Sequence, residues 1–201
     1  MNTLDQDRKA NPKAEVRRQQ ILDAAAECFR KSGFHGASMS EIAKSFGMSA
    51  GHIYNYFDSK ESIIQALVQR DLDQTLDRIA KLQGEKDILK AMLGTVDEGV
   101  QRRIERSELD TEILAEAARN SKVAATVQDT DSVIREKVMN LIKSIQPSRH
   151  APACELSLAA KSTILMALFD GLQIRAIRDP NMKADEVGRV LKVVITQMLQ
   201  S

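Results

Sequence analysis

The sequence is poor in the residues that build strands, turns and disulfide frameworks. Its 201 residues include no Trp, only 2 Tyr and 5 Phe, and just 9 Gly and 4 Pro. Aromatic residues are enriched in strands, and Gly and Pro in turns, so their scarcity favours an all-α protein. The 2 cysteines, Cys28 and Cys154, lie far apart without metal-ligand spacing. We interpret them as small buried side chains in a reducing compartment.

The sequence also lacks a signal peptide, a long apolar segment and a strong charge of either sign. Its N-terminus is polar, and the longest uncharged apolar run covers only residues 162–169, far below the roughly 20 residues that span a bilayer. We therefore expect a cytoplasmic protein that makes no membrane contact. The formal net charge of +1 gives no global indication of nucleic-acid binding.

No arrangement of residues in the sequence has the pattern of an active site. The 3 histidines, His35, His52 and His150, are scattered, and no Ser-His-Asp or Cys-His arrangement, phosphate loop or metal-ligand cluster appears. We expect no catalytic residue, no metal ion and no cofactor, so an enzyme is the least favoured class of function.

Apolar periodicity predicts helices from residue 14 onward, about nine in all. Residues 1–13 have no such pattern and are interpreted as a flexible arm, and the Pro-containing segment 146–152 is interpreted as a loop. The predicted helices cover 14–33, the two helices of segment 39–58, 59–81, 88–104, 109–119, 121–146, 154–177 and a last segment that ends near 199. We expect two helical domains, one over 14–74 and one over 75–201.

The segment 39–58 predicts a helix-turn-helix. Ser38 and Glu41 fit a capping box at its start, and such a cap is worth about 1 kcal/mol. Gly47 lies where the turn needs a positive φ, and Ser49 is expected to cap a recognition helix over 50–57. A second capping box is expected at 58–61, which contains Lys60.

The recognition helix carries unusual outward side chains. Ile53 and Phe57 lie four residues apart and are expected to face the core. The remaining positions face outward and suit phosphate oxygens and base edges: Ala50, Gly51, His52, Tyr54, Asn55 and Tyr56. Gly51 costs roughly 1 kcal/mol against Ala in a helix, which close approach of the backbone to a base or a thymine methyl group would rationalise. This pattern predicts that the domain over 14–74 binds DNA.

Residues 17–67 resemble the N-terminal domain of the TetR/AcrR family of transcriptional regulators. The matching pieces are I-L-D-A-A in the first helix, Gly33-Phe34, S-x-x-E-I-A, G-x-S and I-Y-x-Y-F-x-S-K. The resemblance implies phosphate contacts from Ser38, Ser49, Tyr54, Tyr56 and Lys60. It implies base contacts from Ala50, Gly51, His52 and Asn55. His52-Ile53 stands where the family often has Thr-Leu or Thr-Ile, which leaves the base preferences of the operator open.

The last two predicted helices are expected to form a dimer interface. Residues 154–177 are apolar on nearly every face, and the last helix carries a regular apolar stripe, so a second subunit or a purely intramolecular core must cover them. The expected interface residues are Leu168, Gly171, Leu172, Val187, Val190, Leu191, Val194, Ile195 and Met198. A two-fold dimer would place two recognition helices about 34–36 Å apart, or a multiple of that, on a palindromic operator.

A small-molecule effector is implied mainly by the resemblance, because most family members are repressors that a ligand releases from DNA. The candidate pocket residues are Met92, Val96, Glu112, Glu116, Met166 and Phe169, of which the two glutamates would attract a cationic ligand. These carboxylates would otherwise be solvated or paired with Arg119 or Lys122. The alternative function is a DNA-binding regulator without a small-molecule ligand, controlled by a protein partner or acting constitutively.

Overall fold

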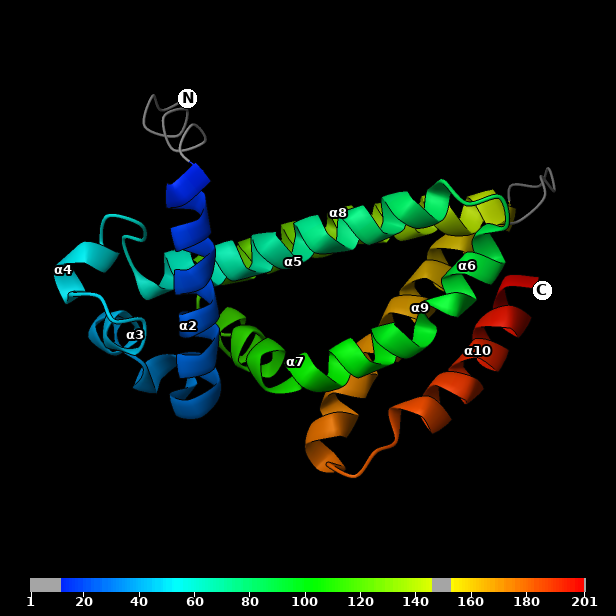
Figure 1. The fold of residues 1–201 in the computed structure, drawn as a ribbon. Helices are drawn as coiled ribbons and strands as arrows, with labels where there is room; N and C mark the ends of the chain where they lie inside the picture. Colours follow the sequence, from blue (N-terminus) through cyan, green and yellow to red (C-terminus); the bar gives the residue numbers. More distant parts are fainter. Residues whose placement is uncertain (1–11, 146–152, 201) are drawn as a thin grey trace. The chain divides into compact units, whose positions relative to one another are not determined.

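The computed structural model of the chain describes residues 12–145 and 153–200. The predicted loop at 146–152 and nearly all of the predicted N-terminal arm lie outside the described residues. Within them the chain forms nine α-helices and no strand (Figure 1), which confirms the all-α prediction. The helices are α2 (Pro12–Gly36), α3 (Met39–Ser45), α4 (Ala50–Ile53), α5 (Lys60–Gln83), α6 (Ile88–Gly94), α7 (Val96–Ala117), α8 (Ser121–Ile145), α9 (Ala153–Arg178) and α10 (Ala184–Gln200).

The helix α2 is interrupted near its end by Gly33. This residue has a φ of 69° and a ψ of 165°, which are not helical values, and one further turn follows to Gly36. A left-handed φ is accessible to glycine because it has no Cβ. The predicted end of the first helix at Gly33 is therefore a break in α2.

The helix boundaries between residues 88 and 119 differ from the prediction. We expected helices over 88–104 and 109–119. In the structure the helix α6 ends at Gly94, and α7 begins at Val96 and continues without interruption through 104–109. Thr95 caps the end of α6 and donates its hydroxyl to the Met92 carbonyl at 2.9 Å. In α7, Arg106 pairs with Asp110 one turn later at 3.0 Å, which supports the helix where we predicted a gap.

The internal contacts of the chain divide it into two compact units. The first, called the reading unit, contains the residues up to Gln69 together with Glu112–Thr126; the second, called the core unit, contains Arg70–Thr111 and the residues from Val127 onward. The predicted domain boundary between 74 and 75 stays a prediction. The reading unit packs its helices around fully buried side chains, among them Ile21, Phe29, Ile42 and Ile63.

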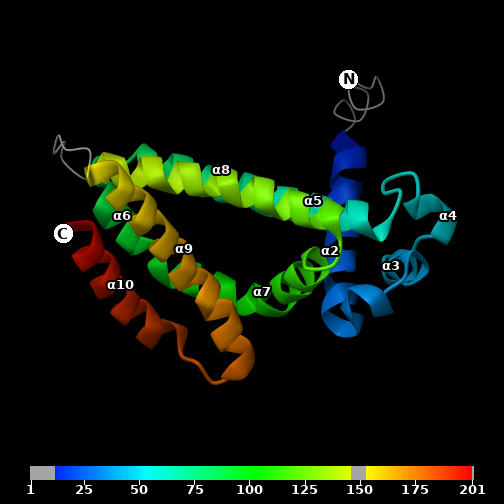
Figure 2. The ribbon, with the colours of Figure 1, turned by 180° about the vertical axis from the view of Figure 1, so that it is seen from behind.

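The core unit has its own apolar centre. Val100, Ile142 and Ile195 are fully buried there, and Figures 1 and 2 show α9 and α10 side by side, in agreement with their contacts. An added Cβ at Gly99 would lie 3.0 Å from the Phe169 ring, so α7 and α9 also approach closely here. No helix within 12–145 and 153–200 is long and apolar enough to cross a membrane.

Candidate nucleic-acid interface

The interface begins at a capped helix in the reading unit. The hydroxyl of Ser38 accepts the Glu41 amide at 3.1 Å, and the Glu41 carboxylate accepts the Ser38 amide at 2.8 Å. This is the predicted capping box, and it is confirmed. Because the side chain of each residue accepts the backbone amide of the other, the start of α3 is fixed at Met39, although the helix has only seven residues.

The turn after α3 also has the predicted form. Gly47 has a φ of 70°, the conformation that favours glycine, and the Met48 amide donates back to the Ala43 carbonyl at 2.8 Å. Ser49 then caps α4, its hydroxyl accepting the His52 amide at 3.3 Å. The recognition helix is shorter than predicted, since α4 ends at Ile53 and residues 54–56 continue as turns.

One side of this segment is occupied by the core of the reading unit. Ile42, Ala43, Ile53 and Phe57 are at most 3% exposed, as their helical spacing predicted. These contacts fix how the recognition segment, residues 49–57, is oriented on the unit. The side chains that do not take part in this core are therefore held at defined positions on the surface.

The opposite side exposes the predicted DNA-contacting residues. Tyr54 is 51% exposed, and the other exposed members are Ser38, Ser49, Ala50, Gly51, His52 and Asn55. Tyr56 is half-buried, and its ring lies 5.8 Å from that of His52. A Cβ added to Gly51 would meet no atom within 4 Å, so no packing within the chain requires glycine there.

Lys60 differs from the expectation that it projects toward DNA. Its ammonium group donates to the carbonyls of Phe34 and Ala37, both at 2.6 Å, and lies 4.6 Å from the centre of the Phe34 ring. These bonds satisfy carbonyls after the break in α2. Two of the three N–H groups of the ammonium are therefore already engaged within the reading unit.

The capping box before α5 lies one residue later than predicted. The hydroxyl of Ser59 accepts the Ser62 amide at 3.2 Å, and the hydroxyl of Ser62 accepts the Ser59 amide at 3.1 Å. Ser59 is thus the capping residue, and the predicted box starting at Asp58 is wrong. The backbone amide of Glu61 and the Ser59 hydroxyl bond to the Glu61 carboxylate, and they lower its pKa from the usual value.

Glu112 and Glu116, predicted as pocket residues, have protein partners in the reading unit. The Glu112 carboxylate accepts the Phe34 amide at 3.0 Å, at the break in α2. One oxygen of Glu116 lies 3.2 Å from His35 Nε2, and the other accepts the side-chain amide of Asn120 at 2.9 Å. Both carboxylates therefore hold the end of α2 against α7 and the residues after it.

The remaining pocket candidates belong to the core unit. Met92 and Val96 are buried in its apolar centre, and Phe169 packs against that centre. Met166 is half-buried on α9. These four residues come from α6, α7 and α9, so the structure separates the predicted set into an apolar group in one unit and an acidic group in the other.

A cluster of charged side chains in the core unit was missed by the sequence reasoning. Arg106 contacts Asp71 at 3.3 Å and Asp110 at 3.0 Å, and Arg103 contacts Asp170 at 3.3 Å. Burial raises the pKa of Asp110 against the opposing effect of Arg106. The spacing of Arg106 and Asp110 was a visible signal, but their pairing with Asp71 depends on how α5 packs on α7.

The predicted dimer residues fall into two groups. Leu191 and Ile195 are buried in the core unit, and four others are half-buried: Leu168, Leu172, Val187 and Met198. Gly171, Val190 and Val194 are exposed. The prediction therefore combined two faces of α10, of which one completes the core of its own unit and the other faces outward.

Comparison with known families places both halves of the chain among transcriptional regulators. Residues 21–67 match the family described as "Bacterial regulatory proteins, tetR family". Residues 85–200 match the family described as "BetI-type transcriptional repressor, C-terminal". The second match alone covers more than half of the chain.

Similar proteins agree with this assignment. The HTH-type transcriptional regulator UidR of Escherichia coli is 31% identical over 159 residues, which cover 79% of this chain and 81% of UidR. The HTH-type transcriptional repressor Rv1474c of Mycobacterium tuberculosis is 30% identical over 140 residues, covering 66% of this chain and 73% of that protein.

Solved structures share the fold. Salmonella enterica GusR superposes with a TM-score of 0.76 at 23% identity and covers 96% of this chain and 100% of its own. FadR of Bacillus subtilis, solved in complex with stearoyl-CoA, has a TM-score of 0.70 at 16% identity and covers 88% of this chain and 96% of its own.

Proposed function

The chain belongs to the TetR family of bacterial helix-turn-helix transcriptional regulators, and we propose that it is a dimeric repressor that a small molecule releases from a palindromic operator. The observation that carries this proposal is the outward side of the recognition segment. There, Tyr54, Asn55 and His52 are exposed on a backbone that Ser49 caps and the core of the reading unit holds.

The proposed DNA contacts follow from the chemistry of these exposed groups. Ala50, Gly51, His52 and Asn55 approach base edges, and the hydroxyls of Ser49, Tyr54 and Tyr56 donate to phosphates. Ser38 lies on the same surface, but its one O–H donates to the Glu41 carboxylate at 3.0 Å, so a phosphate contact from Ser38 requires that this bond be exchanged. Lys60 contributes the N–H group that its two carbonyl bonds leave over. The open space at Gly51 supports a base contact, since the helix loses stability there without any gain in packing.

The proposed dimer uses the outward faces of α9 and α10. On α9 the exposed residues Ile164, Ala167, Gly171 and Ile174 recur at intervals of three and four. On α10, Val190 is 65% exposed and Val193 is 62% exposed. Two apolar helix faces in water favour association with a second copy, and the small Ala167 and Gly171 side chains allow close approach.

The proposed effector site lies in the core unit. Met92, Val96, Met166 and Phe169 offer apolar side chains. Among the described residues, the buried Nε of Arg106 and Oδ2 of Asp110 have no hydrogen-bond partner, which supports a polar group of a ligand nearby. The structure of FadR with stearoyl-CoA supports the idea that this fold holds a small molecule. Glu112 and Glu116 are assigned instead to holding the end of α2.

Selection of duplexes from a random pool tests the DNA-binding part of the proposal. We expect the purified chain to enrich a sequence with two inverted half-sites, and sedimentation to show a dimer on it. Enrichment of no sequence, or of a single half-site bound by a monomer, would contradict the proposal.

Thermal unfolding with a metabolite library tests the effector part. A compound present at 100 times its Kd stabilises the folded chain by about 2.7 kcal/mol, and the true effector must also weaken binding to the selected duplex. If no compound does both, the regulator without a small-molecule ligand is the better interpretation.

A further inference from the structure

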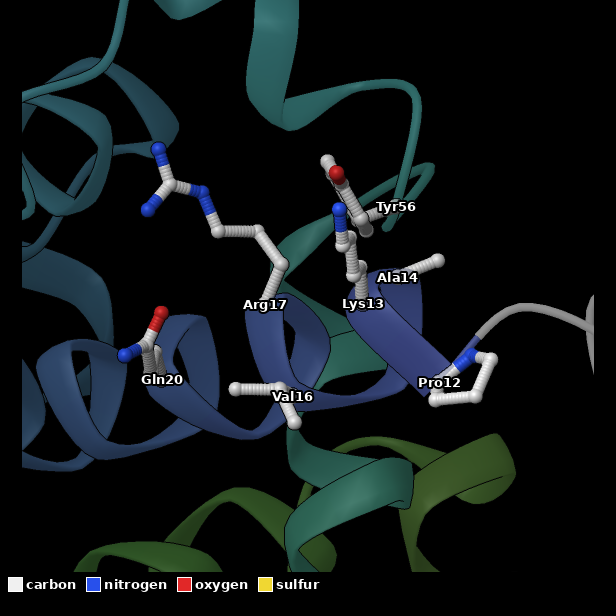
Figure 3. A pocket seen from close by; sticks show the side chains of 7 residues that line it. All are labelled: Pro12, Lys13, Ala14, Val16, Arg17, Gln20 and Tyr56. Carbon is white, nitrogen blue, oxygen red and sulfur yellow. The ribbon is translucent and has the colours of Figure 1, made fainter.

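A surface hollow lies beside the recognition segment in the reading unit. It has a volume of about 570 Å³ and is lined by the first turns of α2 and by Tyr56 (Figure 3). Its polar side chains are Lys13, Arg17, Gln20 and Tyr56, and Figure 3 shows Lys13 and Tyr56 extending in the same direction. All four carry hydrogen-bond donors, and none of the lining residues is a carboxylate. Two of these side chains are cations and no anionic side chain lines the hollow, so the hollow suits a negatively charged ligand that accepts hydrogen bonds.

Arg17 is held in place by an aromatic contact. Its guanidinium carbon lies 4.7 Å from the centre of the Phe46 ring, at the end of α3. Arg17 itself is exposed, and among the described residues it forms no ion pair with a carboxylate. Stacking engages the face of a guanidinium and leaves the N–H groups at its edge available for a planar or phosphate acceptor. The group is thus oriented before any ligand arrives.

Tyr56 makes the hollow continuous with the DNA-binding surface. Its ring lies 5.8 Å from that of His52, and Tyr56 also lines the hollow. A DNA strand that passes the recognition segment brings phosphates, which are acceptors with a negative charge, to this side of Tyr56.

We propose that the hollow binds a backbone phosphate of the same DNA duplex that the recognition segment reads, with Arg17 as its main donor and Gln20 and Tyr56 beside it. The inference rests on the proposed DNA contacts but extends them to the first helix, outside the helix-turn-helix. Such a contact carries no sequence information and fixes how the reading unit lies on the duplex.

Arg18 provides a matched control. It is the next residue on α2, carries the same charge and stacks on a ring in the same manner, with its guanidinium carbon 4.8 Å from the centre of the Phe57 ring. It is half-buried and does not line the hollow. A general effect of positive charge predicts equal losses for the two arginines, whereas a phosphate in the hollow predicts a loss at Arg17 alone.

The test measures binding of the full chain to its selected duplex at several salt concentrations. We expect Arg17→Ala to reduce the slope of log K against log salt by about 0.9, the value for one phosphate of B-DNA. Arg18→Ala should keep the wild-type slope, and Arg17→Lys should restore it. An unchanged slope for Arg17→Ala, or an equal decrease for Arg18→Ala, would overturn the inference.

A second variant avoids the loss of the stacked side chain. Gln20 is exposed, and Gln20→Glu keeps its shape while placing a negative charge in the hollow. We expect affinity for the duplex to fall on the order of tenfold or more, because like charges then face each other. Gln74→Glu, at an exposed position of α5, changes net charge equally and should have little effect.

Equal affinities of the two glutamate variants would overturn the inference and leave the proposed function standing. Failure of the wild-type chain to select any duplex would overturn both. Thermal unfolding of each variant establishes that it is folded before its affinity is compared.

Discussion

The recognition segment and α10 each bury one apolar side in their own unit, and they differ in the side chains that they expose to water. Each buries one apolar side: Ile53 in the reading unit and Ile195 in the core unit are both fully buried. The outward side of the recognition segment then carries Tyr54 and Asn55, whereas that of α10 carries Val190 and Val193. Neither set of exposed side chains is buried in the core of its own unit.

This difference indicates the kind of partner that each surface takes. Exposed hydroxyl, amide and imidazole groups lose little in water and match phosphates and base edges. Exposed valines on one helix face are unfavourable in water and gain by covering one another. This is why we propose DNA as the partner of the polar surface and a second copy of the chain as the partner of the apolar surface.

The largest expected effect distinguishes the two sides of α10. Ile195→Ala should lower the free energy of unfolding by about 2–5 kcal/mol, because it leaves a cavity in a fully buried site. Urea denaturation followed by circular dichroism measures this change. A loss below about 1 kcal/mol would mean that Ile195 is not part of a tightly packed core.

A charge on the outward side of α10 should split the dimer without unfolding the chain. Val190→Glu buries an unpaired carboxylate in the proposed interface, so the dimer should dissociate on the order of a hundredfold more readily. Analytical ultracentrifugation measures the association. Val133→Glu, at an exposed valine of α8, is the control, and equal dissociation of both variants would place the interface elsewhere.

On the polar surface, variants that remove a base contact and variants that remove a phosphate contact should differ in how they affect binding to selected and to random DNA. Asn55→Ala should cost about 1–3 kcal/mol on the selected duplex and little on random DNA, as expected for a residue that reads a base edge. Tyr54→Phe, which removes only a hydroxyl, should weaken binding to both duplexes by a similar factor. Fluorescence anisotropy on the two duplexes compares them, and the reverse pattern would exchange their roles.

The cap before α3 should contribute a smaller amount to the stability of the polar surface. Ser38→Ala removes the acceptor of the Glu41 amide and should cost about 1 kcal/mol of unfolding free energy. Ser40→Ala, at the exposed second residue of the same helix, should be near neutral. If the two variants unfold alike, the capping box has no role in positioning the recognition segment.

The smallest effect concerns acid pH at the start of α5. Glu61 has a pKa below its usual value because backbone and Ser59 donors bond to its charged form. A lowered folded-state pKa contributes stability that is present above the unfolded value near 4.5 and is lost as pH falls through the folded value. Glu61→Gln should therefore be less stable than wild type near pH 7, by about 0.5 kcal/mol or less.

The difference between Glu61→Gln and wild type should shrink as the pH falls below 4.5. Unfolding followed by fluorescence or circular dichroism across pH 3–7 measures it. A difference that grows toward acid pH would contradict the assigned direction of the pKa shift.

Where the sequence prediction succeeded, the determining contacts are local. Ser38 and Glu41 are three residues apart, and Ile53 and Phe57 are four apart. The positive φ at Gly47 is a property of that residue alone. Segments of this kind are decided by hydrogen bonds and side-chain periodicity within one or two turns. The break at Gly94 was missed because apolar spacing continues across it.

The contacts that the sequence did not predict join residues far apart along the chain. Lys60 bonds to carbonyls 23 and 26 residues away, and Glu112 bonds to an amide 78 residues away. Arg17 reaches Phe46 only because α2 and α3 pack together. No spacing in the sequence indicates these contacts, since they depend on how helices meet.

The sequence by itself determined that the chain is helical, where its recognition segment lies and which family it belongs to, because periodicity, caps and turn residues depend on short stretches of sequence. Only the tertiary structure decided which apolar face of α10 is buried and which is outward. It also decided where the glutamates of α7 bind, and that a hollow lined by Lys13 and Arg17 and by no carboxylate includes Tyr56. Both valines and isoleucines read as apolar in the sequence, and only packing determines which of them meets water.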